Sequence, residues 1–239
     1  MLDSVSKSFG EVAAVRDVSF SVRRGEIFGL VGPNGAGKTT ILRMILDIFR
    51  PDAGEIRIGG SAIDDDAKDR IGYLPEERGI YVHLKIRSLL EYFAQLKGLS
   101  RARARANAER WMRRFEFWDA RDRRIETLSK GNQQKVQLIA ALVADPEVVI
   151  LDEPLTGLDP VNVRAIVDVV RELSAEGKTV IFSSHQMNVV ESLCDRVLMI
   201  HRGRAVLGGS PEEIRREHAN GDGPVSLEDV YVRIVKEEQ

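Results

Sequence analysis

Residues 32–39 read Gly32-Pro33-Asn34-Gly35-Ala36-Gly37-Lys38-Thr39 and match the pattern G-x-x-x-x-G-K-[ST] at every fixed position. An apolar run at Ile27–Val31, typical of a buried parallel strand, precedes this stretch. Residues 40–49, which have apolar side chains at helical spacing, follow it. Because a strand, a glycine-rich loop and a helix occur in this order, the stretch predicts an α/β fold built around a phosphate-binding loop.

The residue types of this loop suit the binding of a nucleoside triphosphate. Glycines let the backbone approach the phosphates, and successive N–H groups then point into one concavity at a helix N-terminus. Lys38 can add a full positive charge for the β- and γ-phosphates, and Thr39 a hydroxyl for Mg²⁺. The predicted ATP contacts of the loop are Gly32, Pro33, Asn34, Gly35, Ala36, Gly37, Lys38, Thr39 and Thr40.

Two later strands end in residues that could complete a hydrolytic site. The apolar run 148–151 ends in Asp152, a candidate to hold Mg²⁺ through its water shell, and Glu153, a candidate general base for the attacking water. The buried run 179–182 leads to His185. Since the carboxyl ends of parallel strands gather at the ligand crevice, His185 is a candidate contact of the γ-phosphate.

Composition limits the classes of protein to consider. The chain has 239 residues, a formal net charge of −2 and a single cysteine, Cys194. The small net charge gives no overall attraction to nucleic acid. A single cysteine forms no internal disulfide, which fits a reducing compartment. No apolar run approaches the ~20 residues of a membrane-spanning helix, so a partner would have to supply any membrane-spanning segment. The many arginines near residues 101–124 are interpreted as a solvated helix face, because acidic residues are interspersed among them.

Strand and helix patterns alternate along most of the chain. Strands are expected at 18–22, 55–58, 178–182 and 196–200, with a short first strand before residue 10, and helices at 164–173 and 186–194. The middle is expected to be helical. Ser88 and Glu91 form a capping-box pattern, Ser210-Pro211 predicts a capped helix start, and a tail helix is expected near Ser226.

Residues 128–135, Leu-Ser-Lys-Gly-Asn-Gln-Gln-Lys, resemble the L-S-G-G-Q signature of the nucleotide-binding domains of ABC transporters. The resemblance covers roughly residues 4–215 and implies a P-loop NTPase core of ABC type, with an antiparallel β subdomain and an inserted α-helical subdomain at about 80–144. It assigns residues 1–215 to the ATPase domain and 216–239 to a short C-terminal tail. The motifs are most similar to the sodium- or drug-export branch of this family.

The resemblance also implies roles for residues outside the phosphate loop. Phe9 would stack on adenine, and Asp159 lies in a loop that would cross the interface between two ATPase subunits. The signature of one subunit would contact ATP held by the other. The residues in question are Ser129, Lys130, Gly131 and Asn132.

Three positions depart from the family pattern. Lys130 replaces a glycine and Asn132 a glutamine of the signature. Glu76 occupies the position of the glutamine that contacts Mg²⁺ and senses the permease. A carboxylate there could contact the metal or its waters, but it cannot donate a hydrogen bond as an amide does.

The resemblance implies an ATPase that binds ATP and Mg²⁺ and powers transport, in the export direction. Its expected partners are a second ATPase subunit, with a homodimer favoured over a heterodimer, and integral membrane permease subunits; no nucleic acid is expected. The chain itself is expected to be cytoplasmic and held at the cytoplasmic face of the cell membrane by the permease. Two other readings are a soluble ABC ATPase acting on nucleic acid or the ribosome, and a regulatory ATP-sensing module. The single phosphate loop argues against the first, and the complete set of Lys38, Asp152, Glu153 and His185 against the second.

Overall fold

The computed structural model describes residues 1–77, 79, 81–219 and 225–237. The chain divides into two compact units, Met1–Lys68 with Leu173–Gln239, and Asp69–Glu172. The predicted helical segment 80–144 and the predicted tail 216–239 both include positions outside the described residues (80, 220–224 and 238–239).

The first unit contains an antiparallel sheet in the order β2-β1-β4-β5. β1 and β2 form a hairpin that turns at Gly10, whose φ of 59° is a left-handed value suited to glycine. β1 is eight residues long, so the expectation of a short first strand was wrong. β1 extends to Leu2 because its backbone pairs with both β2 and β4. The strands are β1 (Leu2–Phe9), β2 (Val12–Phe20), β4 (Ala53–Ile58) and β5 (Ser61–Ala62).

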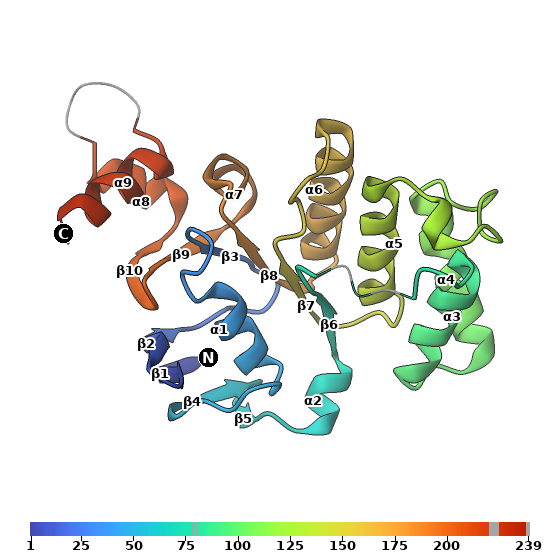
Figure 1. Ribbon diagram of the computed structural model, residues 1–239, viewed down its shortest axis with the longest axis horizontal. Helices are drawn as coiled ribbons and strands as arrows, with labels where there is room; N and C mark the ends of the chain where they lie inside the picture. Colours follow the sequence, from blue (N-terminus) through green and yellow to red (C-terminus); the bar gives the residue numbers. More distant parts are fainter. Residues whose placement is uncertain (78, 80, 220–224, 238–239) are drawn as a thin grey trace. The chain divides into compact units, whose positions relative to one another are not determined.

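A mostly parallel set of strands, in the order β10-β9-β3-β8, carries the phosphate loop of the first unit (Figure 1). All five residues of β3 are buried, as expected for a parallel strand covered on both faces. Helix α7 packs so closely on β3 that a methyl group on Gly29 would come within 2.8 Å of Val190. The strands are β3 (Ile27–Val31), β8 (Thr179–Ser184), β9 (Arg196–His201) and β10 (Arg204–Gly209). The helices are α1 (Lys38–Ile45), α2 (Asp65–Asp69), which ends at the unit boundary, α7 (Met187–Leu193), α8 (Pro211–Glu217) and α9 (Leu227–Glu237).

The second unit joins two parallel strands to a group of helices. β6 and β7 pair in register from Ile71 opposite Val148 to Leu74 opposite Leu151. Helices α3, α4 and α5 contact one another and lie side by side in Figure 1. The elements are β6 (Ile71–Leu74), α3 (Ile86–Leu96), α4 (Arg101–Arg114), a 3₁₀ turn (Ile125–Thr127), α5 (Lys130–Leu142), β7 (Val148–Asp152) and α6 (Pro160–Ala175), whose last turn crosses the unit boundary.

The predicted helix caps had different outcomes. Ser210 caps α8 in a full capping box with Glu213, and the tail helix α9 begins at Leu227, as expected. The capping box predicted at Ser88 was wrong, because α3 begins at Ile86 with Lys85 as its N-cap residue. Backbone pairing decides that start: Ile86 N–H donates to Arg123 O at 3.1 Å, and Lys85 forms a β-bridge with Arg124.

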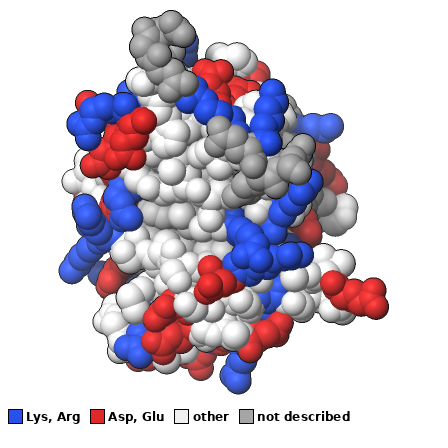
Figure 2. Space-filling view, turned by 90° about the vertical axis from the view of Figure 1, so that its left-hand side faces the viewer, with Lys and Arg blue, Asp and Glu red and all other residues white. Residues whose placement is uncertain are grey.

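Charged side chains of both signs are interspersed on the surface. On the face shown in Figure 2, basic and acidic groups surround a broad uncharged area. In the second unit, Arg113 pairs with Glu109 at 2.8 Å, and Arg114 pairs with Glu172. None of the helices in the described part of the chain is both long and apolar enough to cross a membrane.

Replacing Phe182 with alanine is expected to lower the free energy of unfolding by about 3–5 kcal/mol, because removal of this side chain opens a cavity beside β8. The Phe182 side chain is fully buried, with 0% exposure, whereas Val12 is 68% exposed. Urea denaturation followed by circular dichroism would measure the loss, with Val12→Ala as the matched control. Equal losses in the two variants would contradict this account of the core.

Candidate functional site

The phosphate loop connects β3 to α1 in the first unit. Lys38 is 5% exposed, and its ammonium group donates to Gly32 O at 2.7 Å and to Pro33 O at 3.1 Å. Gly37 is the N-cap residue of α1 with φ of 109°, and no side chain accepts a hydrogen bond from the first turn there. The loop therefore presents a helix N-terminus and a positioned ammonium group, an arrangement that suits an anion.

Two other segments of the first unit support the loop through backbone contacts. A methyl group on Gly37 would lie 2.5 Å from Ala14 O in β2. Gly203, in the turn between β9 and β10, donates its N–H to Ala36 O at 2.9 Å and accepts from Arg16 N–H at 2.7 Å. Glycine is therefore required at Gly37 both for its φ and for the close approach. Sequence analysis missed Gly203, for which no local pattern gives a signal.

His185 lies at the same edge of the sheet as the phosphate loop. It follows Ser184, which pairs with Val31 in β3 and accepts a hydrogen bond from Gly32 N–H at 3.4 Å. His185 also lines a cavity of about 350 Å³ together with the exposed loop residues Pro33 and Asn34. The remaining lining residues come from α7 and α9 and are Met187, Glu228, Tyr231 and Val232.

The candidate catalytic carboxylates lie at the end of β7 in the second unit. Asp152 is 0% exposed and Glu153 is 5% exposed. Glu153 has φ of 48°, a left-handed value that is uncommon for a residue with a side chain and costs about 1–3 kcal/mol. Thr156 Oγ1 donates to Glu153 Oε2 at 3.3 Å. Strain at this residue, together with burial of its carboxylate, is typical of a functional position.

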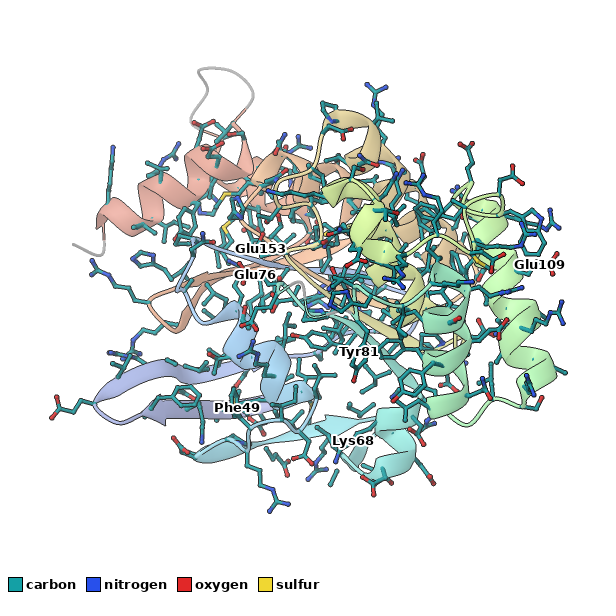
Figure 3. The ribbon with its side chains drawn as sticks, turned by 45° about the vertical axis from the view of Figure 1, so that its right-hand side comes forward. Phe49, Lys68, Glu76, Tyr81, Glu109 and Glu153 are labelled. Carbon is teal, nitrogen blue, oxygen red and sulfur yellow. The ribbon has the colours of Figure 1, made fainter. Side chains whose placement is uncertain are left out.

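Glu76 lies just after the end of β6, and Glu153 lies just after the end of β7. Leu74 and Leu151 are register partners, so each glutamate lies two residues beyond the last pair of these parallel strands. In the view of Figure 3 the labelled residues Glu76 and Glu153 lie close together. Glu76 is exposed, unlike Glu153. The register therefore brings the backbone of the Glu76 loop to the edge of the sheet that carries Asp152 and Glu153.

The signature segment forms the N-terminus of α5. Ser129 is the N-cap residue and accepts from Asn132 N–H at 3.4 Å, while Lys130 is exposed. Two buried glutamines of α5 reach neighbouring loops: Gln134 Nε2 donates to Pro154 O at 3.4 Å, and Gln137 Nε2 donates to Glu77 O at 3.3 Å. α5 therefore contacts the loop after Glu153 and the loop that carries Glu76.

Asp159 caps α6. Its Oδ1 accepts from the N–H groups of Val161 and Asn162, each at 3.0 Å, and its Oδ2 accepts from the side-chain amide of Asn162. Hydrogen bonds from the Asn162 backbone and side chain hold the pKa of Asp159 below its usual value. The carboxylate is therefore charged at neutral pH and fixed in direction.

Phe9 lies at the end of β1 with its ring 45% exposed. The ring meets Phe49 edge-on, with a centroid separation of 5.2 Å, and Lys7 Nζ lies 5.7 Å from its centroid. An exposed aromatic ring beside a cation can accept a stacked base.

The candidate metal ligands are oxygen atoms of single side chains, which can be compared with what Mg²⁺ requires. Among the described residues, no group of three or more His, Cys, Asp or Glu side chains is arranged to hold a metal ion. Mg²⁺ keeps several waters and is bound by one or two carboxylates together with phosphate oxygens. Oxygen donors of this kind occur in each unit taken by itself: the Thr39 hydroxyl in the first, and the buried Asp152 carboxylate and the exposed Glu76 carboxylate in the second.

Comparison with protein families and curated sequences gives consistent results. A model of the ABC transporter family matches residues 15–156. The uncharacterized ABC transporter ATP-binding protein YhaQ of Bacillus subtilis is 41% identical over 228 residues, covering 95% of this chain and 76% of YhaQ. The ABC transporter ATP-binding protein NatA of Bacillus subtilis is 40% identical, covering 88% of this chain and 87% of NatA. The Nod factor export ATP-binding protein I of Paraburkholderia xenovorans is 38% identical, covering 98% of this chain and 80% of that protein.

Solved structures show the same fold. The ATP-binding subunit of an ABC transporter superposes with a TM-score of 0.88 at 30% identity and covers 98% of each chain. The dimeric ATP-binding cassette MJ0796, in a post-hydrolysis state with ADP and phosphate, superposes with a TM-score of 0.79 at 25% identity, covering 87% of this chain and 97% of that chain. The predicted α/β core of P-loop ABC type, with its antiparallel and helical parts, is confirmed.

Replacing Gly37 with alanine is expected to weaken ATP binding by at least about tenfold, since the added methyl group would push the phosphate loop away from Ala14. Gly177→Ala is the matched control. Gly177 has φ of 81°, so alanine is strained there too, but nothing lies within 4 Å of the added atom. Titration with a fluorescent ATP analogue would measure both affinities. Equal losses in the two variants would show that backbone strain, and not the contact with Ala14, is responsible.

Proposed function

The chain belongs to the ABC transporter family as an ATP-binding subunit, and we propose that it hydrolyses ATP as one member of a pair that drives a separate membrane permease. The observation that carries this proposal is the phosphate loop, in which the Lys38 ammonium group donates to Gly32 O. The same chain has two buried carboxylates, those of Asp152 and Glu153, at the end of β7. NatA is named as an ABC transporter protein and the Nod factor protein as an export protein, and together with the signature segment these relatives support a role in transport and favour export.

ATP binding is proposed to begin at the phosphate loop of the first unit. The N–H groups at the start of α1 and the ammonium group of Lys38 would bind the phosphate oxygens. Phe9 would stack on the adenine ring, since its ring is exposed at the end of β1. The proposed ATP contacts run from Gly32 to Thr40, as in the sequence analysis.

Mg²⁺ would neutralise charge on the β- and γ-phosphates, held by the Thr39 hydroxyl and by Asp152, with Glu76 near its waters. Asp152 has no exposed surface, and a carboxylate buried to this degree needs hydrogen-bond donors or a cation around it. Burial at the tip of a strand therefore supports its proposed role better than the pattern of residues alone.

Hydrolysis would use Glu153 as the general base and His185 as a contact of the γ-phosphate. The unusual φ of Glu153 turns its side chain out of the regular alternation of β7, and Thr156 restrains one of its oxygens. His185 lies next to the phosphate loop and shares a cavity with Pro33 and Asn34. A base held in one direction takes a proton from water without first having to reorganise.

Dimerisation of two ATPase subunits would complete the ATP site. Subunits of this family dimerise and work with permeases, and we propose a homodimer because one chain carries every hydrolytic residue. Ser129, Lys130, Gly131 and Asn132 of one subunit would face ATP bound to the other, with Asp159 at the interface. The N-terminus of α5 would then direct its partial positive charge at the γ-phosphate. The permease would hold the pair at the cytoplasmic face of the membrane.

Glu153→Gln is expected to bind ATP normally and to lower turnover by about 10²–10⁴-fold, because an amide cannot act as a base. In the presence of ATP and Mg²⁺ this variant should accumulate as a dimer, since hydrolysis no longer separates the subunits. Phosphate release and sedimentation velocity would measure the two effects. A variant that stays monomeric with ATP bound would contradict the paired mechanism.

Lys38→Ala is expected to weaken ATP binding by about 10- to 100-fold, because a hydrogen bond to a charged group contributes about 1.5–3 kcal/mol. Lys85→Ala, which changes an exposed lysine at the start of α3, serves as the control. Calorimetric titration with ATP would give both affinities. Unchanged affinity in Lys38→Ala would overturn the assignment of the phosphate loop.

The transport role is tested by purification from native membranes in mild detergent, followed by identification of the proteins that co-purify. A permease with several membrane spans is expected to co-purify in stoichiometric amounts. Recovery with ribosomes or nucleic acid, and with no membrane protein, would contradict the proposal.

A further inference from the structure

Gly131 in the signature segment lies unusually close to α6. A methyl group built on Gly131 would come within 2.5 Å of Asn162 Nδ2 and within 3.0 Å of its Cγ. The contact involves the side chain of one residue, and no other atoms come as near to this position. In the proposed function Gly131 faces the ATP of the partner subunit, and the approach of Asn162 is a second constraint on this position.

Asn162 is fixed from its other side by the loop that carries Asp159. Its backbone N–H donates to Asp159 Oδ1 at 3.0 Å, and its side-chain amide donates to Asp159 Oδ2. Asn162 is half-buried in the first turn of α6, which begins at Pro160. One amide group is therefore held by the Asp159 carboxylate while it contacts the backbone of Gly131.

Both connected segments belong to the second unit, and each is capped by its own side chain. Ser129 caps α5 and Asp159 caps α6, so the first turn of each helix is held within its own segment. Asn162 lies between the two helix starts, bonded to Asp159 and close to Gly131.

We propose that Asn162 is a positioning residue that locks the signature segment (Ser129–Asn132) to the Asp159 loop, so that both meet the partner subunit as one surface. This inference rests on the proposed function, in which both segments face the second subunit. Asn162 needs no contact with ATP in this role. It determines how well the paired subunits close, and it leaves the affinity of the phosphate loop for ATP unchanged.

A double-variant experiment in the Glu153→Gln background tests the proposal. Gly131→Ala should weaken ATP-driven dimerisation by about tenfold, because the new methyl group meets a side-chain amide that its hydrogen bond to Asp159 holds in place. Asn162→Ala should weaken it less, because the lock is lost but nothing clashes. Gly131→Ala combined with Asn162→Ala should recover to the level of Asn162→Ala alone, because the clashing atoms are gone. Arg164→Ala, at an exposed position of the same helix, is the control and should dimerise as the parent does.

ATP affinity is measured in parallel for every variant, at protein concentrations low enough to keep the subunits monomeric, and should stay within about twofold of the parent. A double variant as impaired as Gly131→Ala both in dimerisation and in its unfolding midpoint without nucleotide would overturn the proposal, because the added methyl group would then act on something other than Asn162. A loss of ATP affinity equal to the loss of dimerisation would also overturn it, because the effect would then be general unfolding.

The test also separates this inference from the proposed function. If the Glu153→Gln parent itself stays monomeric with ATP, the proposed function fails, and the claim that Asn162 acts on pairing fails with it. Urea denaturation without nucleotide still tests the contact between Gly131 and Asn162. Gly131→Ala should lower the unfolding midpoint and the double variant should restore it to that of Asn162→Ala. A midpoint that is not restored would overturn the contact between Gly131 and Asn162.

Discussion

The close approach of three backbone segments around Gly37 is the constraint on which the phosphate site depends. Ala14 O lies where a side chain of Gly37 would be, and Gly203 is hydrogen-bonded to Ala36. These contacts hold the start of α1 and the end of β3 in one arrangement, so that Lys38 can reach back to its own loop. Positive charge is thereby concentrated at a helix N-terminus before any ligand arrives, and binding needs little reorganisation.

In the second unit, α5 has a comparable role for the segments that carry the proposed catalytic residues. Gln134 contacts the carbonyl group after Glu153, Gln137 contacts the carbonyl group of Glu77, and Gly131 contacts Asn162. The signature, the carboxylate strand and the Glu76 loop are therefore attached to one helix. A displacement of α5 has to carry these loops along or break hydrogen bonds of buried amide groups, which is costly in a low-dielectric interior.

Departures from the predicted elements have a common cause. Ser88 has the right neighbours for a helix cap, yet α3 begins earlier because its first residues pair with the backbone around Arg123. β1 extends to Leu2 because strands on both sides supply partners for its backbone groups. In each case hydrogen bonds to residues distant in the sequence outweigh a local preference, which is worth only about 1 kcal/mol.

The glycine-rich loop, the buried strands followed by carboxylates and the signature segment were all predictable from the residues alone. Each of these depends on residue types at fixed local spacing, such as glycine where the backbone must turn and an apolar run where a strand is covered on both faces. Three contacts became visible only in the folded chain: Gly203 supports Ala36, His185 shares a cavity with α9, and Asn162 lies beside Gly131. These pairs lie far apart along the chain, and packing between elements, which no local period encodes, brings them together.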